Sequence, residues 1–270
     1  MMKMLLKNLL LNPIAFLLLT TAVYAQPELA FDTDEPPTME KLTSVKERFT
    51  YGVRYGFLNL GEVEVITTPD TTYDGMEVIH LRTVMKSNHR IPFVGKREVH
   101  YQSFSKFTDE WPYSFVFWRD DLHDEDYERI KIEFDRDQEQ VFFYERGESQ
   151  DTLALEDPAS GGDVIFLFAR MFAGTDHSYE LPVYIENEKG AVKAINFPAI
   201  EKRSYEAFPE PIDTYYSEGI SNVEGPFGFT GEFKAWFATD HLRIPVEAHV
   251  RIIFGNVKVQ LKEYERYESY

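Results

Sequence analysis

Apolar and polar side chains alternate over long stretches of this 270-residue chain, and no other feature limits its fold as strongly. Successive side chains of a β-strand point to opposite faces, so a period of two indicates a strand with one buried face. The pattern is regular over residues 49–57 and again over residues 244–254. In the first of these runs the apolar members are Phe49, Tyr51, Val53, Tyr55 and Phe57. The chain is therefore expected to fold mainly as β-structure.

Similar runs fill most of the remaining sequence and are separated by turn signals. Further strands are predicted at residues 62–66, 76–86, 96–104, 113–119, 127–135, 140–145, 179–186, 191–197, 202–208, 213–218, 230–237, 244–254 and 256–266. Asn59 with Gly61, Glu188-Lys189-Gly190 and Phe254-Gly255-Asn256 supply turn chemistry. This spacing predicts an antiparallel meander. About a dozen strands exceed what a flat sheet holds, so we predict an all-β fold with a strongly curved or barrel-like sheet.

The alternation gives way once, to helical spacing, in the middle of the chain. Residues 163–172 place their apolar side chains on one broad face after Gly161-Gly162. Asp163 is expected to cap the start of this helix and Gly174 its end. One short apolar helix is expected to flank or plug a curved sheet.

The first 25 residues have the composition of an export signal peptide. Lys3 and Lys7 supply a basic start, an apolar stretch follows, and Val23-Tyr24-Ala25 offers a cleavage site. An uncleaved membrane anchor is the alternative, but Asn12-Pro13 interrupts the apolar stretch. We therefore predict an exported protein, periplasmic or associated with the cell envelope. No later segment is apolar enough to cross a membrane, so the chain is expected to be soluble once the signal peptide is removed.

The rest of the chain divides into an arm and one domain. Residues 26–46 are acidic and contain prolines, without strand or helix periodicity, and predict a flexible arm. Residues 47–270 are expected to form a single β-barrel-like domain, a common size for all-β folds. The formal charge of −18 weighs against nucleic acids and anionic lipid surfaces as partners. The absence of cysteine from the sequence excludes disulfides and thiol chemistry.

No sequence pattern of known chemistry stands out. The seven histidines lack the spacing of a zinc protease, although a metal site built from distant strands stays open. The acidic run Asp120–Asp126 lacks the ligand pattern of an EF-hand and is interpreted as a solvated turn. Ser160-Gly161-Gly162 lacks the preceding strand of a nucleophile elbow. A glycosidase-like pair of carboxylates is neither supported nor excluded. We predict that the protein is not an enzyme and has no cofactor.

Five distinctive residues near the C-terminus are interpreted as a structural corner: Trp236, Asp240, Arg243, Pro245 and Gly255. Arg243 is expected to reach back to Asp240 across a turn, and Pro245 to mark the start or edge of a strand. Gly255 is expected to lie in a tight hairpin. Surface Asp–Arg pairs are common and individually weak, which favours this structural interpretation over a binding site.

The same stretches carry a family resemblance. They are residues 47–53 (ERFTYGV) with 59–62 (NLGE), residues 231–237 (GEFKAWF) with Asp240, residues 243–246 (RIPV), and residues 255–261 (GNVKVQL). With the central helix, they make the chain from Glu47 to Tyr267 resemble the domain of unknown function 3108 family, found among exported proteins of Gram-negative bacteria. The resemblance implies an envelope-associated, barrel-like antiparallel β protein and supplies no catalytic residues.

Three functions stay open at this point. A curved sheet with many aromatic residues can enclose a hydrophobic small molecule or lipid, which favours a binding or carrier module. A fully packed interior is equally compatible with the same argument. The acidic arm and an open sheet edge could instead pair with another envelope protein. An envelope hydrolase, the third alternative, needs convergent polar groups that the spacing does not reveal.

Overall fold

The computed structural model describes residues 35–91, 95–108, 110–123, 126–225, 229–252 and 255–267, which form one antiparallel sheet of 14 strands with little helix. The strands are β1 (Lys46–Tyr55), β2 (Leu58–Tyr73), β3 (Met76–Ser87), β4 (Glu98–Phe107), β5 (Pro112–His123), β6 (Asp126–Asp135), β7 (Gln140–Glu145), β8 (Glu148–Ala154), β9 (Ser178–Ile185), β10 (Glu188–Arg203), β11 (Ile212–Gly225), β12 (Phe229–Ala238), β13 (Pro245–Ile252) and β14 (Gly255–Tyr267). The helical elements are α1 (Met39–Thr43), η1 (Gly162–Val164), α2 (Ile165–Phe168) and η2 (Ala169–Met171). The predicted all-β fold with a strongly curved sheet is confirmed.

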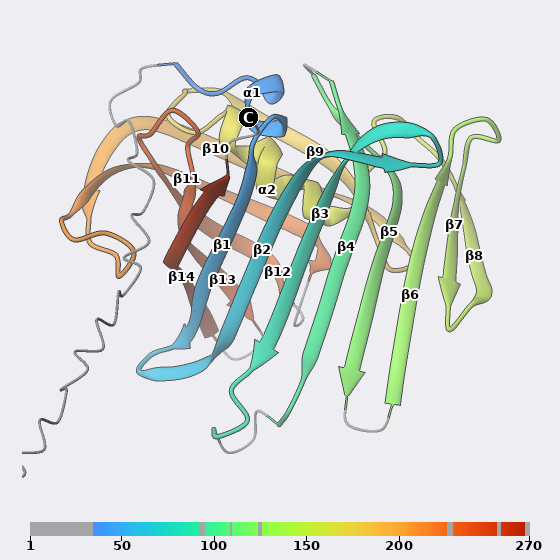
Figure 1. Ribbon diagram of the computed structural model, residues 1–270, viewed down its shortest axis with the longest axis horizontal. Coiled ribbons are helices and arrows are strands. Elements are labelled where there is room, and N and C mark those ends of the chain that lie inside the picture. The colour runs from blue at the N-terminus through green and yellow to red at the C-terminus, as the bar shows by residue number, and fades with distance from the viewer. Residues whose placement is uncertain are drawn as a thin grey trace, which may run out of the picture.

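The sheet is a meander whose first and last strands pair with each other. Consecutive strands are neighbours throughout, except that β1 pairs with β14 and that β8 and β9 are the two edges. Strand pairing therefore leaves the sheet unclosed between β8 and β9. Figure 1 shows β1–β8 as one wall in front and β9–β14 curving behind it, with α2 between the two walls.

Residues 159–161, which we call the strap, connect β5 on one wall to the edge strand β9 on the other. The Ser114 amide on β5 donates to the Ala159 carbonyl at 3.2 Å, and the Tyr184 amide on β9 donates to the Ser160 carbonyl at 2.8 Å. Gly161 also forms a parallel bridge with Tyr184. The strap thus ties the two walls together at one end, and the helical segment 162–171 follows it directly into the interior.

The core lies between the concave side of the sheet and the helical segment. Phe49 and Leu181 from the sheet are fully buried, as are Ile244 just before β13 and Leu167 from α2. The Phe49 ring also meets the Phe166 ring edge-on, with 5.0 Å between the centroids. Packing of a short apolar helix against a curved sheet was the arrangement that the helical spacing predicted.

A buried ion pair fastens the end of the helical segment to the central strands. The Arg170 guanidinium donates to both carboxylate oxygens of Glu47, at 2.7 and 3.1 Å. The Tyr264 hydroxyl donates to the same carboxylate at 2.7 Å, and Arg170 also donates to the Leu242 carbonyl at 2.8 Å. Burial alone would lower the pKa of Arg170, but the carboxylate of Glu47 outweighs it, and the pKa lies above its usual value.

Part of the predicted arm packs onto the domain. Helix α1 begins after Thr38, whose hydroxyl accepts a hydrogen bond from the Lys41 amide at 3.3 Å. Met39 and Leu42 on this helix are buried in the main core. From Glu35 onward the acidic segment is therefore docked, while residues 26–34 and the predicted signal peptide lie outside the described residues.

The first predicted turn is displaced. The β1–β2 hairpin turns at Gly56 and Phe57, where Gly56 has a φ of +56°. Asn59 and Gly61 instead lie within β2, and the register shifts opposite them between Val53 and Arg54. A Cβ on Gly61 would lie 2.2 Å from a backbone oxygen of β3, so glycine serves close approach at this bulge rather than a turn.

Two other strand predictions differ from the structure. Strand β10 continues to Arg203, so the strand predicted at residues 202–208 is wrong beyond that residue, and Tyr205 lies in the loop that follows. Strand β8 was not predicted, because its sequence ESQDTLA is almost wholly exposed and shows no apolar alternation. An edge strand with a solvated surface gives no such signal.

The predicted helix at residues 163–172 is confirmed as three consecutive turns over residues 162–171. Gly161, not Asp163, occupies the N-cap position, because Asp163 is already inside the first turn. Gly174 follows the helical segment with a φ of +83°, as expected of a glycine beyond a helix end. None of the helices in the described part of the chain has the length and apolar character needed to cross a membrane.

Candidate functional site

The concave side of the sheet and the start of the helical segment line a cavity of about 530 Å³ that is partly open to solvent. Cavities that hold small ligands measure roughly 300–1,000 Å³. Both walls of the sheet contribute, so no single stretch of sequence builds the cavity. The apolar lining residues are Tyr51, Val63, Val65, Met85, Tyr101, Phe117, Ile130, Ile165, Phe166, Ile185, Ala235, Pro245, Ala248 and Val259.

Small side chains on one wall leave the room for this cavity. Ala235 on β12 pairs with Ala248 on β13, which in turn pairs with Val259 on β14. On the other wall, Val63 lies between Tyr51 and Met85 in register. Because every second residue of a strand faces inward, these side chains project into the same space.

Charged side chains gather at one end of the cavity. Arg119 on β5 donates to the Glu128 carboxylate at 3.2 Å and contacts the Glu186 carboxylate, which lies in the turn after β9. Arg97 donates through Nε to the Asp121 carboxylate at 3.0 Å. The side chains of Arg97 and Glu186 are 44% and 47% exposed, so this end of the cavity meets solvent.

Asp163 places an ionisable group in the cavity wall. The Ser103 hydroxyl donates to its Oδ2 at 2.5 Å, whereas Oδ1 is buried without a hydrogen-bond partner among the described residues. Ser105 and Ser114 extend this polar row, with 3.0 Å between their hydroxyl oxygens. Burial raises the pKa of Asp163 to about 6, against the opposing hydrogen bond from Ser103. The carboxyl group therefore changes charge close to neutral pH.

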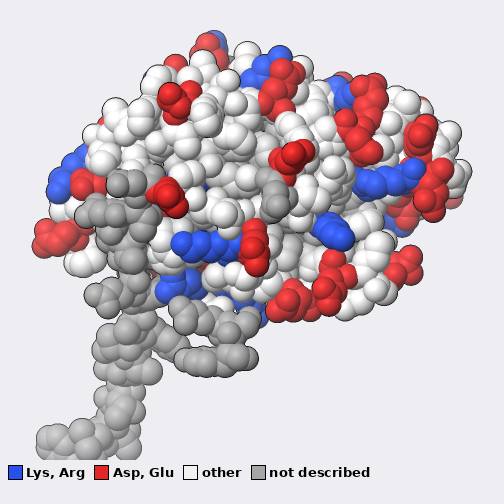
Figure 2. All heavy atoms as spheres, turned by 90° about the horizontal axis from the view of Figure 1, so that it is seen from above, with Lys and Arg blue, Asp and Glu red and all other residues white. Residues whose placement is uncertain are grey.

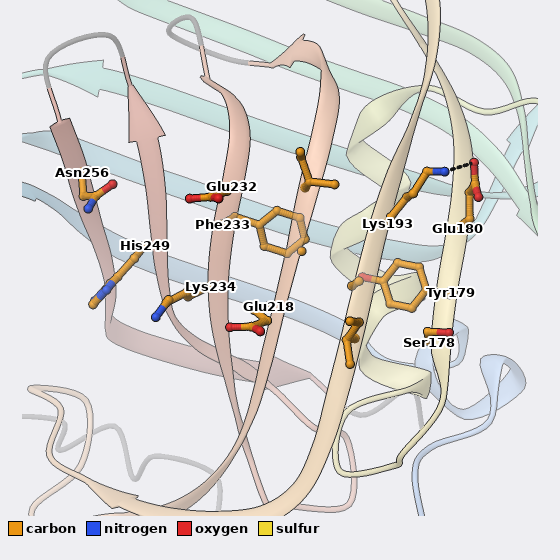
Figure 3. A pocket seen from close by; sticks show the side chains of 14 residues that line it. Ser178, Tyr179, Glu180, Lys193, Glu218, Glu232, Phe233, Lys234, His249 and Asn256 are labelled. Carbon is orange, nitrogen blue, oxygen red and sulfur yellow. Dashed lines mark ion pairs between the residues drawn. The ribbon is translucent and has the colours of Figure 1, made fainter.

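A second hollow, of about 840 Å³, lies on the outer face of β9–β14. Figure 3 shows Glu218, Lys234 and His249 side by side in it, on three neighbouring strands, together with the Lys193–Glu180 ion pair at 2.9 Å. Lys234 directly precedes the inward-facing Ala235 on β12, and the alternation of side chains therefore places this row on the outside. Side chains of both charges line the hollow, so it favours no single ligand charge.

Acidic and basic side chains are similarly mixed over the rest of the visible surface. Figure 2 shows red and blue side chains interspersed over one face of the molecule, with acidic groups at its rim. The exposed ion pairs of the described residues include Arg54–Glu206 at 2.7 Å and Lys262–Glu62 at 2.8 Å. Such exposed pairs contribute little to stability individually.

Trp236 lies on the outer face and is packed rather than available to a ligand. It is 5% exposed, and the Arg203 guanidinium stacks 4.2 Å from its ring centroid. Its indole N–H donates to the Glu201 carboxylate at 2.9 Å, and the Tyr216 ring lies 5.2 Å away. The aromatic and cation–π contacts give Trp236 a structural role in holding β10–β12 together.

Asp240 and Arg243 form the predicted turn but not by the predicted contact. Arg243 reaches back as expected, yet it donates to the carbonyl oxygens of Thr239 at 2.7 Å and Asp240 at 2.9 Å. The Asp240 carboxylate instead accepts from the amides of Leu242 at 3.0 Å and Ile244 at 2.9 Å. Both residues are fully buried, so the expectation of a surface pair is wrong. Backbone groups in the buried turn need partners, and these two side chains supply them.

The other two predicted residues lie at strand starts. Pro245 is the first residue of β13, as predicted, and its carbonyl oxygen accepts from the Tyr51 hydroxyl at 2.9 Å within the cavity lining. Gly255 begins β14 with a φ of +128°. The tip of that hairpin, residues 253–254, lies outside the described residues. Of the five predicted residues, Pro245 is the one that reaches the cavity.

The acidic run after Trp118 is not a solvated turn where the structure describes it. Asp120 and Asp121 lie on β5 and are 7% and 6% exposed. Asp120 accepts from Arg129 at 2.6 Å and from Tyr127 at 2.8 Å. Within the described ranges, no three His, Asp or Glu side chains are grouped so as to hold a metal ion.

The polar groups of the cavity were not predicted from the sequence. Arg119 follows Phe117 by two residues and shares its inward face, and Asp163 follows Gly162 at the start of the helical segment. A charged residue at an inward position of an alternating strand was the available signal, because such residues are rarely buried without a reason.

The fold and the cavity together define a class: an open, barrel-like antiparallel β protein with a helical segment on its concave side. In sequence comparisons no family model matches the chain, and no curated protein matches it. Among solved structures, the chain is similar to the beta-barrel-like protein of domain of unknown function DUF1849 from Brucella abortus. The TM-score is 0.51 at 11% sequence identity, over 84% of this chain and 99% of the other. At this identity the similarity concerns the fold, and it does not show the resemblance to the 3108 family.

Proposed function

We propose that the protein is an exported, non-enzymatic binding or carrier module whose hydrophobic or lipid-like ligand occupies the interior cavity. The observation that carries this proposal is the apolar cavity of about 530 Å³ between the sheet and the helical segment. A fully packed interior was the alternative, and it would leave no volume of this size. The export signal predicted from residues 1–25 would place such a carrier where hydrophobic molecules need shielding from water.

The lining favours an apolar chain over a polar solute. Fourteen of the lining residues are apolar or aromatic, and the Tyr51 hydroxyl among them already donates to the Pro245 carbonyl. A ligand that buries roughly 300 Å² of apolar surface gains about 7 kcal/mol before the loss of its own freedom of motion. Binding of an apolar ligand requires a cavity of suitable volume with an apolar lining, and this cavity has both.

The test is to fill the cavity from its wall of small residues. Ala248→Phe places a ring in the space between β13 and the helical segment, and is expected to lower the affinity for an environment-sensitive apolar dye at least about tenfold. Ala199→Phe, at an exposed position in β10, is the matched control and should bind the dye as the wild type does. Fluorescence titration of the full exported chain gives both affinities.

Native mass spectrometry of the same preparation is the second measurement. After gentle extraction, the wild type is expected to carry a mass excess that the Ala248→Phe variant lacks. The proposal fails if the wild type binds no apolar probe saturably, or if both phenylalanine variants bind the dye equally well.

A further inference from the structure

We propose, on the basis of the proposed carrier function, that the ligand is an amphiphile with an anionic headgroup, which takes the place of Glu186 on Arg119. The contact between these two residues joins β5 on one wall of the sheet to the turn after β9 on the other. It thus lies at the charged end of the cavity, where an amphiphile would leave its headgroup. Arg119 and Glu186 both line the cavity.

Arg119 is held close to the apolar lining. Its side chain is 17% exposed, and it is paired across the strand with Ile130 and Tyr101. Its Nε is buried and has no hydrogen-bond partner within the described residues. A buried donor without a partner needs an explanation, and an acceptor brought by a ligand is one. Guanidinium groups also match carboxylate and phosphate oxygens in geometry.

Glu186 is the partner that can leave. Its side chain is 47% exposed, so its carboxylate can return to water at little cost, as is usual for a surface ion pair. It lies in the turn between β9 and β10 with a φ of +53°, outside the strand ladder. Glu128, the other partner of Arg119, is fixed on β6 in register with Asp121.

An anion fits this site by exchange with Glu186. Three acids, Asp121, Glu128 and Glu186, already surround the two cations Arg97 and Arg119, so an added anion needs one of these acids to leave. When an anionic headgroup replaces Glu186 on Arg119, one negative charge takes the place of another beside the guanidinium. A neutral headgroup would leave Arg119 without its second partner, and a cationic one would be repelled by the guanidinium. The chain of the amphiphile then lies along the apolar lining toward Phe166.

The experiment compares headgroups on one alkyl chain. Palmitate, monohexadecyl phosphate, hexadecanol and hexadecyltrimethylammonium are titrated below their micelle concentrations into the full exported chain, by displacement of the apolar dye. We expect the two anions to bind at least about tenfold tighter than the alcohol, the size of one charge-assisted hydrogen bond. The ratio of the two anions then distinguishes a carboxylate ligand from a phosphate ligand.

Two variants test the residues themselves. Arg119→Gln is expected to reduce anion affinity about tenfold or more and leave hexadecanol binding unchanged. Glu186→Gln is expected to raise anion affinity a few-fold, because the competing carboxylate is gone. Glu180→Gln, an exposed acid on β9 that pairs with Lys193 on the outer face, is the matched control. Circular dichroism confirms that each variant is folded, and Glu186→Gln keeps the test decisive if Arg119→Gln does not fold.

The outcomes separate the two proposals. If hexadecanol binds as tightly as the anions, or if Glu186→Gln leaves anion affinity unchanged, the headgroup inference is wrong while the carrier function stands. If the cation binds most tightly, the headgroup inference is also wrong. If none of the four amphiphiles binds to the wild type, the carrier function fails and the headgroup inference fails with it.

Discussion

Replacing Asp163 with asparagine should make the protein more stable at neutral pH, and the effect should vanish in acid. Asp163 lines the cavity, and burial raises the pKa of its carboxyl group from 3.8 to about 6. A raised pKa means that the folded state holds this proton more tightly than the unfolded state does. The free energy of unfolding therefore falls as pH rises from about 4 to about 6, while the folded carboxyl group is forced to ionise.

The size of the effect follows from the pKa. Each pH unit between the unfolded and folded pKa corresponds to about 1.36 kcal/mol, so the ionised carboxylate destabilises the fold by roughly 2–3 kcal/mol above pH 7. Asparagine keeps an acceptor for the Ser103 hydroxyl and never ionises. We expect Asp163→Asn to gain that amount at pH 8 and nothing at pH 4.

Urea denaturation followed by tryptophan fluorescence, at pH 4, 5, 6, 7 and 8, measures this difference. Asp137→Asn is the matched control, because Asp137 is exposed in the turn between β6 and β7. Subtraction of the wild-type curve removes the titration of all other groups. If the difference in stability between Asp163→Asn and wild type does not change with pH, folding does not raise the pKa of this carboxyl group, and the reasoning is refuted.

Two further predictions concern the docking of the helical elements. Arg170→Met should lower the free energy of unfolding by about 3–5 kcal/mol, because it leaves Glu47 buried without its counter-charge. Adding Glu47→Leu to that variant should restore most of the loss in urea denaturation, and a further loss instead would refute the ion-pair argument. Leu42→Ala should cost about 2–5 kcal/mol if α1 is part of the core, whereas Glu40→Ala on the exposed side of α1 should cost almost nothing. Equal stabilities of the two α1 variants would show that the helix is not docked in solution.

The fold was predictable because the alternation of side chains is a local property. Residues 244–254 and 49–57 show the period of two directly, and the structure places a strand at each. Strand β8 was not predictable, because almost all of its residues are exposed. Alternation of apolar and polar side chains marks a strand only when one face is buried and the other is not. The turn predicted at Gly61 is a bulge. Glycine is found in turns, but it is also needed where two backbones lie close together, as β2 and β3 do here.

The site was less predictable because it depends on distance in space. The cavity forms where Ala235 and Ala248 line the same space as Tyr51, and no local pattern says which strands come together. The Arg119–Glu186 contact joins residues 67 positions apart, one on β5 and the other in the turn after β9. Trp236, Asp240 and Arg243 are distinctive residues in the sequence. Their side chains are buried in the packing of a structural corner and do not line the cavity.

Because β1 pairs with β14, the sheet needs both the first and the last strand of the domain. Glu47 and Tyr264, which are 217 positions apart, are joined by a hydrogen bond at the centre of the sheet. The centre of the sheet therefore forms only when the two ends of the domain meet, and contacts of such long range form slowly. Among the described strands, β1–β8 and β9–β14 are joined by strand pairing only through β1 and β14, so a polypeptide that ends before β14 would lack the strand that makes the two halves one sheet.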